Sequence, residues 1–324
     1  MDAQEEILQE PVNRFVLYPI KYNEIWKMYK TAVSAFWQVE EIDFSKDIDD
    51  WQNKLNDNER TFIEHILSFF AASDGLVDEN IVTRFYNDVK IPEARAFYTF
   101  QMAIESVHSE TYSLMIDTFV KDPVRKEKLL DGMHKIPGIQ KKAEWTMKWI
   151  ESPDAPFAMR LLAFAVVEGT FFQSSFASIY WLKERNLMPG LAASNVLISR
   201  DESMHVSFGV LLYSMLKNKL DESVVHELVK EAVAIEIEFI TESIPCSMLG
   251  MNNDLMSDYV KFVADRLVVQ LGYNKIYDAK NPFPFMERMS LENKDNFFET
   301  RSLDYSKANI GQTNIYDFST TEDF

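Results

Sequence analysis

Residues 101–115 read QMAIESVHSETYSLM, and this stretch decides the fold. Glu105, His108 and Tyr112 stand three and then four residues apart, so a helix of 3.6 residues per turn carries all three on one face. A carboxylate and an imidazole placed in this way can bind one metal ion. Tyr112 would lie about 6 Å further along the helix axis. The stretch therefore predicts a helix that brings a metal-binding pair and a tyrosine to the same side.

A second Glu-x-x-His occurs at Glu202 and His205, with Gly209 at the position that corresponds to the tyrosine. One such pair alone is weak evidence for a metal site, because a glutamate and a histidine on a solvated helix face give the same pattern. Two copies, each in an apolar helical segment, are much stronger. They favour a bundle in which two helices each supply a carboxylate and an imidazole.

Two further carboxylates complete this pattern. Asp74 falls on an apolar helical stripe, and Glu168 lies within a long apolar helix. A carboxylate in such a place costs several kcal/mol, on the order of a buried unpaired charge, unless it is paired or bound to metal. Asp74 precedes Glu105 by 31 residues and Glu168 precedes Glu202 by 34, so each half of the chain offers one carboxylate helix and then one Glu-x-x-His helix.

The charges of these six residues indicate two metal ions. Four buried carboxylates repel one another, and two divalent cations would balance them while both histidines stay neutral. Carboxylate and imidazole without thiolate suit iron or manganese better than structural zinc. The predicted ligands are Asp74, Glu105, His108, Glu168, Glu202 and His205.

Composition restricts the classes of partner. The chain has 324 residues, 47% of them apolar, with 24 Phe but only 9 Gly, which suits long helices. A formal net charge of -18 disfavours binding to nucleic acid or to an acidic membrane surface. Cys246 is the single cysteine, which fits a reducing, cytoplasmic location, and the N-terminus lacks the pattern of a signal peptide. The apolar stretch 159–182 contains Glu168, so we expect a buried core helix instead of a membrane span.

The chain divides into three parts. Residues 1–21 are expected to be irregular, residues 22–277 to form the helical domain, and residues 278–324 to form an irregular or mobile tail. Residues 123–151 are lysine-rich and predict surface helices. The glutamates around Glu236 predict a solvated acidic face, and Asp78 is expected at the surface.

The tail carries spaced aromatic residues, among them Tyr305, Phe318 and Phe324. These side chains could anchor the tail to a partner, or they could have no function. For the predicted site, several reactions with O₂ stay open: hydroxylation of a substrate, iron storage, or oxidation of a nearby side chain. Tyr112 is the candidate for the last, and an ordinary core tyrosine is the alternative.

Four segments closely resemble the small, radical-bearing subunit of class I ribonucleotide reductase, in the form found in eukaryotes and their large DNA viruses. Shorter matches extend the resemblance over nearly the whole chain. The four segments are Ser68–Gly75, Glu105–Tyr112, Val167–Phe172 and Ile198–His205, and the shorter matches are Arg14–Pro19, Ala35–Trp37 and Asn296–Glu299.

The resemblance implies an all-α fold, a ferritin-like helical bundle with a dinuclear metal site in its core. Asp74, Glu105 and His108 would hold one iron, and Glu168, Glu202 and His205 the other. Manganese in place of iron stays possible. After O₂ activation the stable radical would reside on Tyr112.

Further roles follow from the same resemblance. The route for the electron and proton would run through Trp37, Asp201 and His108. Tyr305 would relay the electron and proton to the large catalytic subunit. Phe172 and Phe176 would shield the radical. The tail would bind that subunit through Phe318, Asp323 and Phe324, although Thr321 stands where the family commonly has an acidic residue. A homodimer is implied as well.

Two other functions compete with this one. The first is a di-metal oxidase or hydroxylase acting on a small substrate, against which Trp37, Tyr112 and the aromatic tail argue. The second is a non-catalytic iron-binding protein, which would hold many irons per chain and no organic radical.

Overall fold

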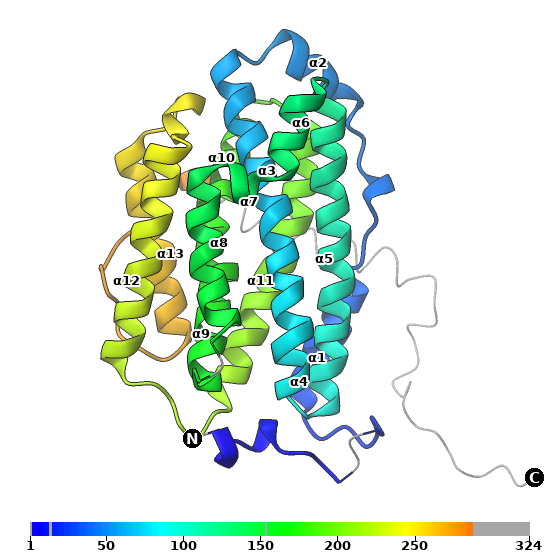
Figure 1. Cartoon of the computed structure of the whole chain (residues 1–324), viewed down its shortest axis with the longest axis vertical. Coiled ribbons are helices and arrows are strands. Elements are labelled where there is room, and N and C mark those ends of the chain that lie inside the picture. Colours follow the sequence, from blue (N-terminus) through cyan, green and yellow to red (C-terminus); the bar gives the residue numbers. More distant parts are fainter. Residues whose placement is uncertain (1, 13–14, 153, 288–324) are drawn as a thin grey trace, which may run out of the picture.

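The computed structural model describes residues 2–12, 15–152 and 154–287, and every regular element among them is helical. The long helices run roughly along the long axis of the molecule, with α3 and α5 on one side, α12 and α13 on the other, and α8 and α9 between them (Figure 1). The helices are α1 (Asn23–Ser34), α2 (Ser45–Asn53), α3 (Asp57–Asn80), α4 (Tyr86–Asp88), α5 (Pro92–Phe119), α6 (Pro123–Leu130), α7 (Gly132–Lys135), α8 (Pro137–Ile150), α9 (Phe157–Val166), α10 (Gln173–Glu184), α11 (Pro189–Ser214), α12 (Glu222–Glu238) and α13 (Asn253–Gln270).

Several short elements join these helices. Three are π-helical turns, which contain one residue more per turn than an α-helix and occur often at functional sites. They are η4 (Ile81–Phe85), η5 (Val167–Phe171) and η6 (Phe239–Ser243). The 3₁₀ turns are η1 (Asp2–Gln4), η2 (Glu6–Leu8), η3 (Val39–Glu41) and η7 (Cys246–Leu249).

Local sequence explains where the central helices begin. Asn56 caps α3: its side chain accepts from the backbone N–H of Glu59 at 3.0 Å, and the Glu59 carboxylate accepts from the Asn56 N–H at 2.8 Å. Helix α5 starts with Pro92, whose missing N–H costs nothing at a first helical position. Helix α11 is capped from outside, because Asp47 of α2 accepts the backbone N–H groups of Gly190 and Leu191, each at 2.7 Å.

Helices α9 and α10 join through η5 into one continuous helix, Phe157–Glu184, which is long and apolar enough to cross a membrane by length and composition alone. Its most apolar window is 94% buried inside the protein. This helix therefore forms the centre of the core, as its mid-helix Glu168 predicts.

Residues 278–287, assigned to the tail by the sequence analysis, instead pack on the bundle. Phe283 lies 5.5 Å from Tyr259, and Phe285 lies 5.9 Å from Trp181, between ring centroids. The Asp265 carboxylate accepts three backbone N–H groups of the preceding segment, from Ile276, Tyr277 and Ala279. Two buried phenylalanines without helical spacing give no periodic signal, and so the sequence pattern ends before the packed chain does.

Candidate metal centre

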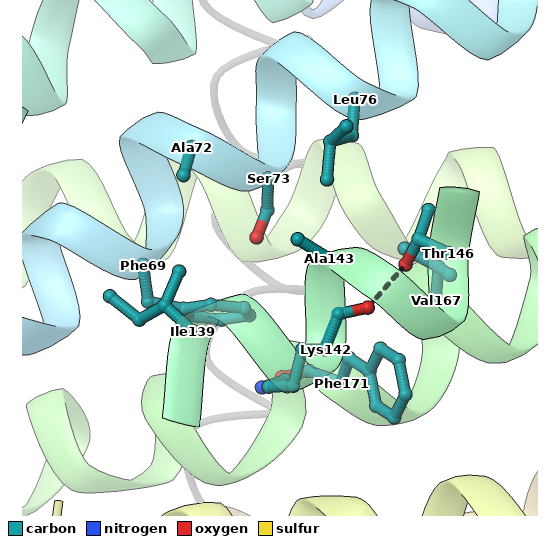
Figure 2. Close-up of a pocket in the computed structure, with 10 residues that line it drawn as sticks. All are labelled: Phe69, Ala72, Ser73, Leu76, Ile139, Lys142, Ala143, Thr146, Val167 and Phe171. Atoms are coloured by element: carbon teal, nitrogen blue, oxygen red, sulfur yellow. Dashed lines mark hydrogen bonds between the residues drawn. The ribbon is translucent and has the colours of Figure 1, made fainter. Parts of the chain in front are cut away.

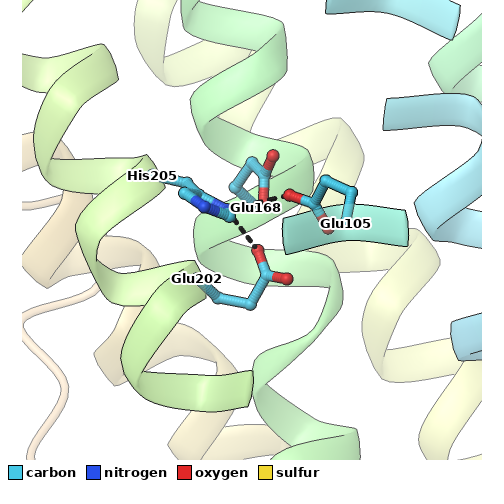
Figure 3. A group of neighbouring side chains, drawn as sticks. All are labelled: Glu105, Glu168, Glu202 and His205. Atoms are coloured by element: carbon cyan, nitrogen blue, oxygen red, sulfur yellow. Dashed lines mark hydrogen bonds and ion pairs between the residues drawn. The ribbon is translucent and has the colours of Figure 1, made fainter. Parts of the chain in front are cut away.

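The six predicted ligands come from four helices and meet in the core. Asp74 lies on α3, Glu105 and His108 on α5, Glu168 on η5, and Glu202 and His205 on α11. All six residues are at most 2% exposed. They form two overlapping groups, in which the ligand atoms lie within 4.8 Å of one another: Asp74, Glu105 and His108 in one, and Glu105, Glu168, Glu202 and His205 in the other (Figure 3).

Both imidazoles present Nδ1 to the centre of this cluster. His108 Nδ1 lies 3.1 Å from Glu105 Oε2 and 3.2 Å from Glu202 Oε1. His205 Nδ1 lies 2.9 Å from Glu105 Oε1 and 3.3 Å from Glu202 Oε2. Glu105 and Glu202 thus each face both histidines, which is the arrangement needed for carboxylates shared between two metal ions.

The donor set fits two divalent cations. Asp74 Oδ2 and Glu168 Oε2 are buried and have no hydrogen-bond partner, so each keeps lone pairs free for a ligand. Burial raises the pKa of Asp74 and of Glu168 well above the usual range, and the neighbouring glutamates raise it further. Burial alone would lower the pKa of His205, but Glu105 and Glu202 raise it to about 10. All three shifts mean that the crowded cluster takes up protons, and bound cations could replace those protons and leave the carboxylates ionised.

Glu168 owes its position to the π-helical turn η5. The wider turn breaks the regular i, i+4 spacing of the helix at this residue. Gly169 follows it where η5 approaches α11: a Cβ atom at Gly169 would lie 3.4 Å from Val206 Cγ2. The sequence of residues 157–184 contains no pattern that predicts a π-helical turn. The turn is therefore visible only in the structure.

Trp37, Asp201 and His108 form a buried chain of hydrogen bonds. Trp37 Nε1 donates to Asp201 Oδ2 at 2.8 Å, and His108 Nε2 lies 3.2 Å from the same oxygen. The Trp37 and His108 rings stack at 5.9 Å. When His108 donates its Nε2–H to Asp201, the Nδ1 lone pair is directed at the cluster.

Arg200 extends this chain, which the sequence analysis did not predict. Its guanidinium donates to Asp201 Oδ1 at 3.1 Å and to the carbonyl of Ala35 at 2.7 Å. It thereby ties α11 to the segment before Trp37. An arginine directly before Asp201 is the available signal, but one arginine in a helix is too common to be decisive.

Tyr112 is buried in an apolar pocket one turn beyond His108. It is 2% exposed and stacks on Phe70 at 4.6 Å. Phe70 in turn stacks on Phe172 at 5.9 Å and on Phe176 at 5.1 Å. Burial raises the pKa of Tyr112 well above its usual value, and the carboxylates of the cluster raise it further. The phenol is therefore neutral, and water is largely excluded from it.

The remaining predicted residues lie outside the described part of the chain: Tyr305, Phe318, Asp323 and Phe324. Three surface assignments are wrong. Lys142 and Glu236 are 2% and 0% exposed and form an ion pair, since both lie on the apolar stripes of their helices. Asp78 is half-buried, and burial raises its pKa to about 7.

Known proteins resemble the chain over nearly its whole length. The family profile "Ribonucleotide reductase, small chain" matches residues 14–282. A ribonucleoside-diphosphate reductase small chain from Neurospora crassa is 57% identical over 309 residues, covering 95% of this chain and 75% of the relative. The small chain from Yaba-like disease virus is 53% identical and covers 94% of each.

Two solved structures share the fold of this chain. The Rnr4 homodimer of Saccharomyces cerevisiae ribonucleotide reductase has a TM-score of 0.82 at 38% identity and covers 93% of each chain. The dimanganese(II)-NrdF of Streptococcus sanguinis shares the fold, with a TM-score of 0.74 at 20% identity, covering 87% of this chain and 99% of that one. The family profile matches residues 14–282, and relatives above 50% identity cover nearly the whole chain. The chain therefore belongs to the ribonucleotide reductase small-chain family.

Proposed function

We propose that this chain is the small subunit of a ribonucleoside-diphosphate reductase, and that it generates and stores a radical on Tyr112. One observation carries the proposal: a buried six-ligand cluster lies one helical turn from a tyrosine in a pocket of phenylalanines. The large catalytic subunit would use this radical to reduce ribonucleotides to deoxyribonucleotides.

The six cluster residues would hold two iron ions, with manganese as the alternative metal. Once bound, the two ions would supply electrons for the reduction of O₂ and leave an oxidising equivalent beside the cluster. The residues of the chain set the conditions for this chemistry: Glu105 and Glu202 each face both histidines, and Asp201 fixes the His108 ring. Burial keeps water away from all of them.

Tyr112 would lose one electron and its phenolic proton, since the neutral phenol is the form present in the pocket. Stacking on Phe70 holds the ring in one orientation. Phe172 and Phe176 close the pocket around Phe70, and with no donor groups of their own they offer the radical nothing to react with. A stored radical needs this isolation.

Transfer to the large subunit would begin at Trp37. The indole shares Asp201 Oδ2 with His108, so an electron can move along stacked rings while the carboxylate holds the accompanying proton. Tyr305 would continue the route, and Phe318, Asp323 and Phe324 would bind the large subunit through the tail. The family relationship and the Rnr4 homodimer support a dimer of this chain, and Cys246 as the single cysteine supports a cytoplasmic location.

Reconstitution tests the function. The full chain is loaded with Fe²⁺ and O₂ and mixed with a large subunit from a relative, and conversion of a ribonucleoside diphosphate to its deoxy form is measured. Activity should require both proteins and the metal, and should vanish when Phe318–Phe324 are deleted while the metal content stays the same. Product formed without a large subunit would instead indicate an independent oxidase.

A further inference from the structure

Lys142 of α8 is a buried cation outside the metal centre. Its side chain is 2% exposed, and its Nζ lies 2.7 Å from Oε2 of Glu236 on α12, which is 0% exposed. Ser174 of α10 donates to the other oxygen of Glu236. Burial lowers the pKa of Lys142 to about 8, an effect that Glu236 opposes, so the ammonium is charged at neutral pH.

The same ammonium also holds the π-helical turn. Nζ donates to the carbonyl oxygen of Phe171, the last residue of η5, at 2.6 Å. It lies over the rings of Phe69 and Phe239, 3.5 Å and 4.0 Å from their centroids. Figure 2 shows Lys142 between Phe69 of α3 and Phe171 of η5. Two helices, α3 and α12, and two π-helical turns, η5 and η6, therefore converge on the nitrogen atom of this α8 lysine.

Stability alone is a weak reason for this arrangement. A buried ion pair is often no better than well-packed apolar side chains of the same volume. What an apolar residue could not supply is a donor to the Phe171 carbonyl. The adjoining cavity has a volume of ≈ 10 Å³, which is enough for about one water molecule. Bulk water therefore has no room to take the place of the ammonium.

Glu168 stands three residues before Phe171 in the same five-residue turn. A π-helical turn disturbs the regular hydrogen-bond ladder, and a donor from outside that ladder can fix its position within a long helix. We propose that Lys142 is a positioning residue for the metal centre: by binding the Phe171 carbonyl it fixes η5, and thereby holds the Glu168 carboxylate at the second metal position. This inference rests on the proposed function, which makes Glu168 a metal ligand.

Two variants separate the donor from the ion pair. Glu236→Gln removes the charge pair and keeps the Lys142 donor. Lys142→Met/Glu236→Gln removes both without leaving an unpaired carboxylate. Mn²⁺ alone is titrated into each full-length protein under anaerobic conditions, and bound and free metal are measured by electron paramagnetic resonance. Circular dichroism gives the melting temperature of each metal-free protein.

We expect wild type and Glu236→Gln to bind two Mn²⁺ per chain. In the double variant the second Mn²⁺ should bind about tenfold or more weakly, as when an outer-shell partner of a ligand is lost. The inference is overturned if the double variant binds both ions with wild-type affinity, or if Glu236→Gln loses as much affinity as the double variant. A wild-type protein that binds fewer than two ions would contradict the proposed metal centre itself.

Lys142→Arg is the test if the double variant does not fold. It keeps a charge for Glu236, but the planar guanidinium cannot occupy the place of the ammonium over Phe69 and beside the Phe171 carbonyl. Weaker binding of the second Mn²⁺ at an unchanged melting temperature supports the inference. Two ions bound with wild-type affinity overturn it.

Discussion

The two Glu-x-x-His pairs are alike in sequence and differ in their surroundings. His108 lies in a polar chain: its Nε2 faces Asp201, which also accepts from Trp37 and Arg200. Its helix then supplies Tyr112 one turn later. Under the proposed function, this side of the centre would connect the metal positions to a radical on Tyr112 and to the transfer route at Trp37.

His205 lies against aromatic rings. Phe97 meets it edge-on at 6.4 Å and stacks on Phe208 at 3.8 Å. Gly209 stands at the position that corresponds to Tyr112, so this pair has no phenol beside it, and a Cβ there would lie at an ordinary van der Waals distance, 3.8 Å, from Ala165 Cβ of α9. A repeated ligand pair therefore need not repeat a function: under the proposed function, one side would transfer charge and the other side would insulate.

The largest expected effect comes from breaking the polar side. Trp37→Phe removes the indole N–H and leaves Asp201 without one donor, while the aromatic packing on His108 is kept. We expect the Tyr112 radical to form and reductase turnover with the large subunit to fall below detection. Phe97→Leu on the other side is the control: it should cost about 1 kcal/mol of stability and leave most turnover intact. Equal losses in both variants would remove the distinction between the two sides.

Glu202→Ala should affect both sides at once, because this carboxylate faces Nδ1 of His108 and of His205. We expect the second metal ion to bind more than roughly 100-fold more weakly, beyond what loss of an outer-shell partner costs. Metal analysis after gel filtration measures this. Glu238→Ala removes the same charge from an exposed position and should bind two ions normally; if it also loses metal, net charge and not ligation controls binding.

Phe176→Ala tests the isolation of Tyr112. Removing a buried ring should cost about 3–5 kcal/mol of stability, which denaturant unfolding will measure. The cavity would also admit small reductants to the pocket behind Phe70. The radical should therefore decay faster when a small water-soluble reductant is added. An unchanged decay rate would show that Phe176 has only a packing role.

The smallest effect concerns the N-terminus of α11, which α2 anchors. Burial raises the pKa of Asp47 to about 6 from 3.8, so between these pH values the folded chain holds a proton that the unfolded chain releases. The contribution of Asp47 to the free energy of unfolding should therefore fall by about 2 kcal/mol as the pH rises from 4 to 6, and stay level above. Asp47→Asn should lack this fall. Parallel pH profiles of the two proteins by denaturant unfolding would contradict the assignment.

Apolar periodicity predicted much of the centre, because Asp74 and Glu168 stand out as carboxylates on apolar stripes. The same rule applied to Lys142 and Glu236 would have placed them in the core, where the structure has them. Other features have no local signal. Trp37 and Asp201 are 164 residues apart and were paired only through the family resemblance, and η5 carries no residue pattern that distinguishes it from α-helix.

In the proposed function, the buried cluster holds two metal ions and Tyr112 carries the radical. Electron paramagnetic resonance on the full chain loaded with Fe²⁺ and O₂, with iron analysis of the same sample, tests it most directly. We predict near two irons per chain and a tyrosyl signal, and in Tyr112→Phe the same iron content without the signal. A signal of unchanged shape in Tyr112→Phe, or a wild-type protein that binds two irons and forms no radical, would contradict the account.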